Sequence, residues 1–192
     1  CALPIWGTNL MPTQHALLSA SSAHRWLHCT GSPKLEQEFP DSTSVYAQEG
    51  TLAHELCELK LKKYTTVMPK GAYTRAHNKI MKSELWQNEM EGTSEIYLEY
   101  VKGIMLACEI APAVLIEKRV DFSRYVPEGF GTADCLILAG DTLHVIDYKH
   151  GKGVVVDADH NPQMMLYALG AMNELSLLYR FKSVHMVIVQ PR

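Results

Sequence analysis

Two apolar runs separated by only two residues constrain the fold of this chain most strongly. Residues 132–139 and 142–149 are rich in Leu, Ile and Val, and Gly140-Asp141 between them suits a two-residue β-hairpin turn. A turn of this length fixes the register of the two strands. Apolar side chains then alternate onto both faces, so we expect a hairpin that is buried on both sides.

The register brings two carboxylates together. If Ala139 pairs with the residue after the turn, counting back places Asp134 opposite Asp147, and like charges at such a position repel. Lys149 follows two residues after Asp147 and so shares its face. The three residues are either a buried Asp-Lys-Asp salt-bridge cluster or a metal site for phosphodiester hydrolysis, in which both aspartates bind a divalent ion. A longer turn would break this pairing.

The hairpin lies within a change from helical to extended periodicity. The segment from Ser19 to Ser22 can cap a short helix through Cys29, and Thr51 is a plausible N-cap for a helix toward Lys62 and Lys63. A helix is predicted over 94–110 by the stripe of Ile96, Tyr100, Ile104 and Ala107, and Pro112 ends it. The intervening residues 31–46 and 65–82 are polar and are expected to be loops. Strands are predicted over 114–122 and 183–190, and a helix begins at Asn161-Pro162 and runs to about 178.

Length and composition indicate one α+β domain. The chain has 192 residues, of which 47% are apolar, and no apolar run reaches the roughly 18 residues of a membrane helix. Five cysteines without a C-x-x-C spacing indicate neither a disulfide framework nor a zinc site, which fits the cytoplasm. We expect residues 1–10 to be a non-native or disordered leader. A net charge of −3 means that any contact with nucleic acid is local.

Four short motifs now carry a family resemblance. In chain order they are Glu49-Gly-Thr-Leu-Ala-His54, Gly131-Thr-Ala-Asp134, Asp147-Tyr-Lys149 and Gln163-Met-Met-Leu-Tyr167. Together they resemble the PD-(D/E)XK nuclease superfamily, and within it the RecB-like exonuclease branch with its phage-associated members. The resemblance implies a restriction-endonuclease-like core of order α-β-β-β-α-β, with a mixed central sheet flanked by helices. Extra N-terminal helices precede it in one domain spanning residues 11–192, truncated at its C-terminus.

The resemblance assigns roles to the motif residues. It makes His54, Asp134 and Asp147 the ligands of Mg²⁺ or Mn²⁺, adds the backbone carbonyl of Tyr148, and makes Lys149 the catalytic lysine together with the two aspartates. Gln163 and Tyr167 lie one helical turn apart and share a face. Relatives use such a pair to support the site or contact the DNA strand, and ordinary helix packing is the alternative.

Three further residues have a weaker link to the site. Glu117 could add a carboxylate, although we expect an exposed strand glutamate. Lys152, in the basic turn after Lys149, is a candidate DNA phosphate contact. Many relatives bind an iron-sulfur cluster through one N-terminal and several C-terminal cysteines. Cys29 would be the first of these in a longer chain, but we expect no cluster here and a buried, small side chain.

The resulting hypothesis is a metal-dependent deoxyribonuclease. By resemblance it is an exonuclease in phage DNA recombination, repair or processing, located in the bacterial host cytoplasm, with DNA and phage recombination proteins as partners and no membrane association. One alternative is an inactive DNA-binding or assembly module of the same fold. Another is an unrelated metal hydrolase with a small phosphoester substrate. Polarity, strand preference, endonuclease action and oligomeric state stay open.

Overall fold

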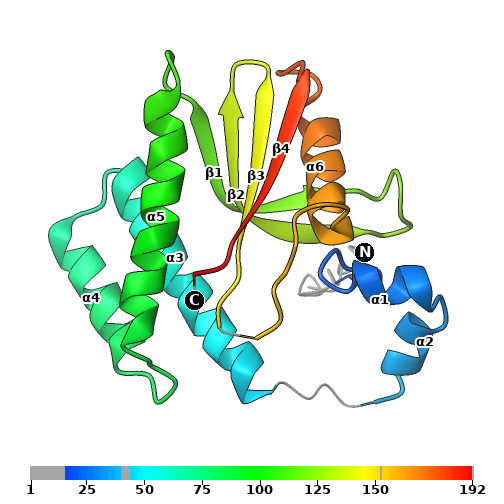
Figure 1. Cartoon of the computed structure of the whole chain (residues 1–192), viewed down its shortest axis with the longest axis horizontal. Coiled ribbons are helices and arrows are strands. Elements are labelled where there is room, and N and C mark those ends of the chain that lie inside the picture. The colour runs from blue at the N-terminus through cyan, green and yellow to red at the C-terminus, as the bar shows by residue number, and fades with distance from the viewer. Residues whose placement is uncertain (1–15, 40–43, 152, 192) are drawn as a thin grey trace, which may run out of the picture.

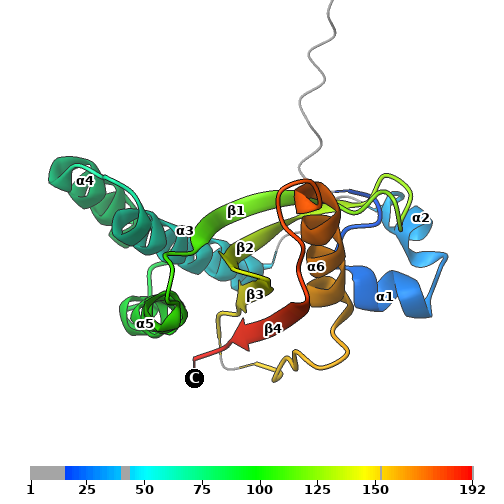
Figure 2. The same ribbon diagram turned by 90° about the horizontal axis from the view of Figure 1, so that it is seen from above.

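The computed structural model describes residues 16–39, 44–151 and 153–191. Its described part is an α+β structure in which a four-stranded mixed sheet lies between two groups of helices. Figure 1 shows α3, α4 and α5 on one side of the sheet and α6 and α1 on the other, and Figure 2 shows the same layers from above. The predicted order of helices followed by β-β-β-α-β is confirmed.

The elements have the following bounds. The helices are α1 (Ala23–His28), α2 (Ser32–Glu36), α3 (Val45–Thr65), α4 (Lys70–Met81), α5 (Glu89–Ala107) and α6 (Pro162–Leu175). The strands are β1 (Ala113–Asp121), β2 (Phe130–Ala139), β3 (Thr142–Tyr148) and β4 (Ser183–Val189).

The sheet has the order β1-β2-β3-β4, with antiparallel pairing of the first three strands and a parallel pair at β3 and β4. Helix α6 connects the parallel pair, as a crossover between such strands requires. The predicted hairpin register is confirmed from Ala139–Thr142 back to Cys135–Ile146. Gly140 has a φ of +60°, the conformation that a type II′ turn requires at its first central position.

Both faces of the hairpin are buried, as predicted. Cys135 and Ile146 pack with α3 and α5 in one core cluster, whereas Leu136 and Val145 pack with α6 and α1 in the other. All four side chains are fully buried. The middle strands therefore have buried apolar residues on both faces, and any buried polar group among them needs a partner.

The first half of the chain contains more helix than the sequence indicates. Residues 31–46 were expected to be a loop, but α2 lies within them, and α3 begins before Thr51. Ser44 caps α3 by accepting a hydrogen bond from the Ala47 amide at 3.2 Å, while Thr51 lies inside the helix and donates to the Ala47 carbonyl at 3.0 Å. The residues around Glu49 are mostly exposed, so they form no apolar stripe from which the first turns of α3 could be predicted.

The loop predicted over residues 65–82 is also wrong, since it contains α4. The apolar stripe of α4 is narrow: only Ile80 is buried, with Tyr73 and Ala76 partly buried against the core. Helix α5 begins and ends earlier than predicted. Its predicted stripe is also rotated, because Ile96 and Tyr100 are exposed and neighbouring residues fill the core.

The start of α6 is predicted correctly. Asn161 is its N-cap, whose side-chain oxygen accepts a hydrogen bond from the Met164 amide at 3.2 Å, and Pro162 occupies the first turn. The predicted leader, residues 1–10, lies outside the described residues. Among the described helices, none combines the length and apolarity needed to cross a membrane.

Candidate metal centre

The candidate site lies where β2 and β3 leave their shared ladder. Asp134 immediately precedes Cys135, which is the first residue of β2 that pairs with β3. Asp147 is the residue before the end of β3. His54 approaches from α3 on one side of the sheet, and Gln163 approaches from the first turn of α6 on the other. Segments that are distant in sequence therefore meet at one end of the sheet.

Asp134 is held by the neighbouring strand and by α3. Its Oδ2 accepts a hydrogen bond of 2.7 Å from the Tyr148 amide and lies 3.3 Å from Nδ1 of His54. The predicted opposition of Asp134 and Asp147 is not a ladder pair among the described residues, because the ladder stops at Cys135 and Ile146. Asp134 therefore has the backbone amide of Tyr148 as its hydrogen-bond partner, where the sequence predicted that it would face the Asp147 carboxylate.

Asp147 is almost completely enclosed, with 1% of its surface exposed. Its Oδ1 accepts a hydrogen bond of 3.1 Å from Gln163 Nε2, and Lys149 Nζ lies 2.9 Å from its Oδ2. This second contact is an ion pair without hydrogen-bond geometry, so Oδ2 has no hydrogen-bond donor among the described residues. Gln163 Oε1 in turn accepts a bond of 3.3 Å from Lys149 Nζ, which closes the group.

Glu117 joins the site through an irregularity in β1. The ladder between β1 and β2 pairs Ile116 with Cys135 and Lys118 with Ala133, but it skips Glu117 and Asp134 between them. Glu117 has a φ of +48°, a strained conformation for a residue with a side chain.

At this position in β1 and β2, the side chains of alternate residues change from one side of the sheet to the other. Ala133 packs toward α6 whereas Cys135 packs toward α3 and α5, although regular alternation would put both on one side. Ligand atoms of His54, Glu117 and Asp134 consequently lie within 4.8 Å of one another. Glu117 is half-buried, so the expectation of an exposed glutamate is wrong.

Burial, together with the charge of Asp134, disfavours ionisation of Glu117 and Asp147. The pKa of Glu117 is raised to about 7, first because the carboxyl is buried and second because the Asp134 carboxylate is near. Burial and the charge of Asp134 also raise the pKa of Asp147, against the effect of Lys149. Burial lowers the pKa of His54, but contact with Asp134 outweighs it, so the pKa is raised. Three carboxyl groups thus share the site with one imidazole and one ammonium group.

This donor set fits a divalent cation. Carboxylate oxygens are the ligands that Mg²⁺ and Mn²⁺ prefer, and one imidazole favours the softer Mn²⁺. A cation would relieve the repulsion between Glu117 and Asp134, which adds to the effect of burial on the pKa of Glu117. Asp147 is not a member of the 4.8 Å cluster, but its buried Oδ2 offers an acceptor with no hydrogen-bond donor among the described residues. The predicted carbonyl of Tyr148 belongs to the residue whose amide already holds Asp134.

The Gln163 and Tyr167 pair supports the site from behind. Gln163 Nε2 donates to the Tyr167 hydroxyl at 3.1 Å as well as to Asp147, and the Tyr167 side chain is buried. A Cβ at Gly131 would come within 2.7 Å of Tyr167 Cε1, which explains the glycine three residues before Asp134. Both residues of the pair thus lie behind the carboxylates, and Gln163 also reaches Lys149.

A cavity of about 660 Å³ opens beside Lys149. Ser21 and His24 of the α1 region line one wall, residues 154–157 line another, and Gln163 lies at the start of α6. The Lys149 ammonium is thus reachable from this cavity, while Asp147 behind it is enclosed.

Two further predicted residues have other outcomes. Cys29 is exposed at the end of α1, so the expected buried side chain is wrong. Lys152 lies outside the described residues, so its predicted role is not tested. Sequence reasoning undervalued Glu117, because regular alternation along β1 gives no sign of the reversal there. The only sequence signal was a carboxylate directly after the apolar run 114–116, at the start of the charged part of β1.

The fold and the site define an α+β protein with a histidine and acidic cluster at one end of a mixed sheet. Residues 15–192 match the family described as "Protein of unknown function (DUF2800)". The match covers nearly the whole chain, and the protein belongs to this family.

Proposed function

We propose that this protein is a divalent-metal-dependent deoxyribonuclease with the restriction-endonuclease-like fold of the RecB-like PD-(D/E)XK branch. The observation that carries the proposal is the convergence of residues from all four motifs. His54 contacts Asp134, and Gln163 contacts both Asp147 and Lys149. A salt-bridge cluster alone would need neither the imidazole nor the amide bridge.

The cation would be held by His54, Asp134 and Asp147, with Glu117 and the Tyr148 carbonyl as further oxygen donors. Glu117 is added to the predicted set because its carboxylate lies in the same cluster. Such a cation, when bound, neutralises charge on the scissile phosphate and acidifies water. Two carboxylates from neighbouring strands and an imidazole from a helix give a site whose donors are fixed by separate elements.

Lys149 would act on the phosphate or on the attacking water. Its side chain is 27% exposed and lines the cavity. Gln163 accepts from the ammonium and donates to Asp147, so it fixes the distance between the positive group and the carboxylate. The lysine can therefore stabilise charge that develops on phosphate oxygens, or orient a water for in-line attack.

DNA is the proposed substrate, and the 660 Å³ cavity beside Lys149 is the proposed entry. The motif resemblance further favours exonuclease action in phage DNA recombination, repair or processing inside a bacterial host, with other recombination proteins as partners. An inactive DNA-binding module of the same fold is the competing proposal. It has less support, because the carboxylates, lysine and histidine of the motifs are all present.

The proposal is tested by degradation of end-labelled single- and double-stranded DNA with Mg²⁺, Mn²⁺ or EDTA. The wild-type protein should cut only with metal. Asp147→Asn and Lys149→Met should lower the rate by roughly 100-fold or more, since each removes charge from the site. Asp141→Asn is a matched control, because Asp141 pairs with Lys182 at the hairpin turn.

Three outcomes separate the candidates. Cutting that is lost in both site variants and kept in Asp141→Asn supports the nuclease. Binding of DNA in EDTA without any cutting in metal supports the inactive module. Cutting of a small phosphodiester that DNA does not inhibit supports an unrelated hydrolase.

A further inference from the structure

Tyr148 lies between the two motif residues Asp147 and Lys149, yet its side chain points into the opposite core. The ring is fully buried and makes edge-to-face contacts with His54 and Tyr97, each with centroids 5.4 Å apart. Its backbone amide meanwhile donates to Asp134 Oδ2. One residue thus touches two of the proposed ligands, His54 through its ring and Asp134 through its amide.

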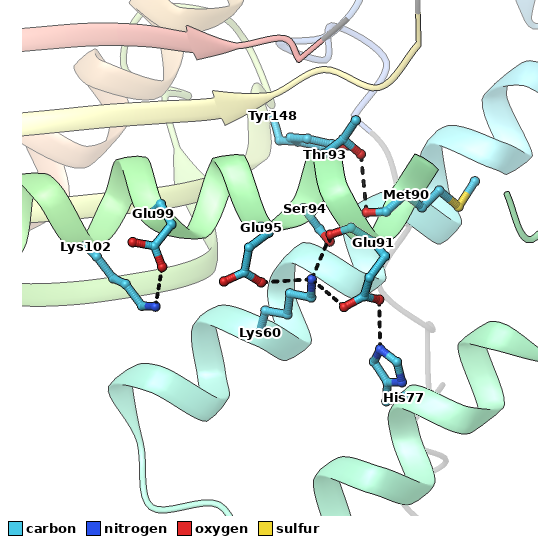
Figure 3. Close-up of polar contacts among 10 residues, drawn as sticks. All are labelled: Lys60, His77, Met90, Glu91, Thr93, Ser94, Glu95, Glu99, Lys102 and Tyr148. Carbon is cyan, nitrogen blue, oxygen red and sulfur yellow. Dashed lines mark hydrogen bonds and ion pairs between the residues drawn. The ribbon is translucent and has the colours of Figure 1, made fainter. Parts of the chain in front are cut away.

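The Tyr148 hydroxyl is tied to the first turns of α5. It donates to Thr93 Oγ1 at 2.9 Å, and Thr93 donates its own proton to the Met90 carbonyl at 3.3 Å (Figure 3). Because a threonine hydroxyl has one proton, this second bond defines Thr93 as the acceptor from Tyr148. Nδ1 of His150 lies 3.3 Å from the same tyrosine hydroxyl.

The turn of α5 that carries Thr93 is itself fixed by two other helices. Lys60 of α3 has only 4% of its surface exposed and contacts the Glu91 carboxylate at 2.8 Å, the Glu91 carbonyl at 3.0 Å and Glu95 at 3.1 Å. His77 of α4 contacts the other oxygen of Glu91 at 3.0 Å (Figure 3). Thr93 is therefore a rigid anchor rather than a residue on a loose surface helix.

We propose that Tyr148 is a positioning residue, and that its hydrogen bond to Thr93 fixes the end of β3 so that Asp134 and His54 are correctly placed for a cation. The inference rests on the proposed function of this site. Tyr148 is held at both ends, by Thr93 at its hydroxyl and by Asp134 at its amide. Loss of the outer bond allows the ring and the strand end to shift, and metal ligands lose affinity when the groups that orient them are removed.

Tyr97 provides a matched control. It is a second buried tyrosine in the same cluster and lies against the Tyr148 ring, but its hydroxyl has no hydrogen-bond partner in the described part of the chain. Removal of this hydroxyl, like removal of the Tyr148 hydroxyl, takes one oxygen atom out of the cluster. It breaks no link to α5.

The test is calorimetric titration of Mn²⁺ into the full chain, with DNA cleavage measured across Mn²⁺ concentrations. Tyr148→Phe and Thr93→Val should each weaken Mn²⁺ affinity about 10-fold, at the lower end of the effect expected for groups that orient ligands. Thr93→Ser keeps the acceptor and should restore wild-type affinity, and Tyr97→Phe should leave it unchanged. At saturating Mn²⁺ the cleavage rate of all four variants should return to within about threefold of wild type, since Lys149 is untouched.

The inference is overturned if Tyr148→Phe and Thr93→Val bind Mn²⁺ as Tyr97→Phe does while the wild type binds metal and cuts DNA. If Tyr148→Phe does not fold, the pair Thr93→Val and Thr93→Ser decides the question. A wild-type protein that neither binds Mn²⁺ nor cuts DNA overturns the proposed function, and this inference with it. The two failures are therefore distinct.

Discussion

Gln163 Nε2 donates a hydrogen bond of 3.1 Å to Asp147 Oδ1, linking the first turn of α6 to the end of β3. The side-chain oxygen of Gln163, Oε1, at the same time accepts a hydrogen bond from Lys149 Nζ. The side-chain amide is therefore matched to its neighbours, with its donor toward a carboxylate and its acceptor toward an ammonium. This relationship gives the Q-x-x-x-Y spacing a physical role.

Replacement of this amide should reduce activity more than stability. Gln163→Ala leaves Asp147 and Lys149 without their bridge, and we expect DNA cleavage to fall about 10- to 100-fold, as for other groups that orient ligands. Asn173→Ala is the control on the same helix, because the Asn173 side chain accepts a hydrogen bond from exposed Arg124, away from the site, while its contacts with Ser176 use the backbone carbonyl. Equal cleavage rates for the two variants would show that Gln163 contributes packing alone.

Gly131 should be intolerant of even a methyl group. Gly131→Ala brings a Cβ to 2.7 Å from Tyr167 Cε1 and 3.3 Å from Ala20 Cβ, and we expect a loss of about 1–3 kcal/mol in the free energy of unfolding. Gly103 provides the contrast, since a Cβ there meets open space within α5. Gly103→Ala should stabilise the helix by about 0.5–1 kcal/mol. Urea denaturation measures both, and a Gly131→Ala protein as stable as wild type would contradict the packing described.

The raised pKa of Glu117 predicts a pH dependence of stability in EDTA. Its folded pKa of about 7 exceeds its ordinary value of 4.5, so the folded state binds the proton more tightly. Stability from this source is complete below pH 4.5 and is lost as the pH rises toward 7. The charged groups that act on Glu117 are His54, Glu58, Lys62 and Asp134.

Glu117→Gln removes this titration. Between pH 5 and 7.5 the wild type should lose on the order of 1 kcal/mol more than the variant, a value reduced for the partial exposure of the carboxyl. Parallel stability curves for the two proteins would contradict the assignment. Saturating Mn²⁺ should reverse the trend in the wild type, because cation binding requires deprotonated ligands.

Tyr97→Phe should be neutral or slightly stabilising. The Tyr97 hydroxyl is buried without a hydrogen-bond partner among the described residues, and its desolvation costs about 1 kcal/mol or more. Removing the hydroxyl removes that cost and leaves the ring contact with Tyr148. Thermal denaturation would show an unchanged or higher midpoint, and a marked fall in the midpoint would mean that the hydroxyl has a partner.

Local rules account for much of the fold. Turn length predicts the hairpin register, and Asn161-Pro162 predicts the start of α6, because both features depend on a few adjacent residues. Helix α4 was missed because its contact with the core is narrow, and most of its residues are polar. The rotated stripe of α5 has another cause: Tyr97 and Ser94 face the core while Ile96 faces outward, contrary to their polarity.

The candidate site could be predicted only in part for a similar reason. Asp147 and Lys149 are two residues apart in a strand, and Gln163 and Tyr167 are four residues apart in a helix. These spacings alone predict that each pair shares a face. The contact between His54 and Asp134 depends on how α3 packs on the sheet, which no local pattern specifies, so its prediction came from the motif resemblance. Glu117 depends on a reversal of two strands at one position, which regular alternation cannot predict.

The central claim is that one divalent cation binds among His54, Glu117, Asp134 and Asp147. Anomalous diffraction from crystals soaked with Mn²⁺ tests it most directly, because the signal locates the ion without assuming a substrate. We predict a single strong peak in contact with His54, Asp134 and at least one of the other two carboxylates, lost in Asp134→Asn crystals. The claim would be contradicted if no peak appeared at this end of the sheet at a Mn²⁺ concentration that saturates the manganese sites of other proteins.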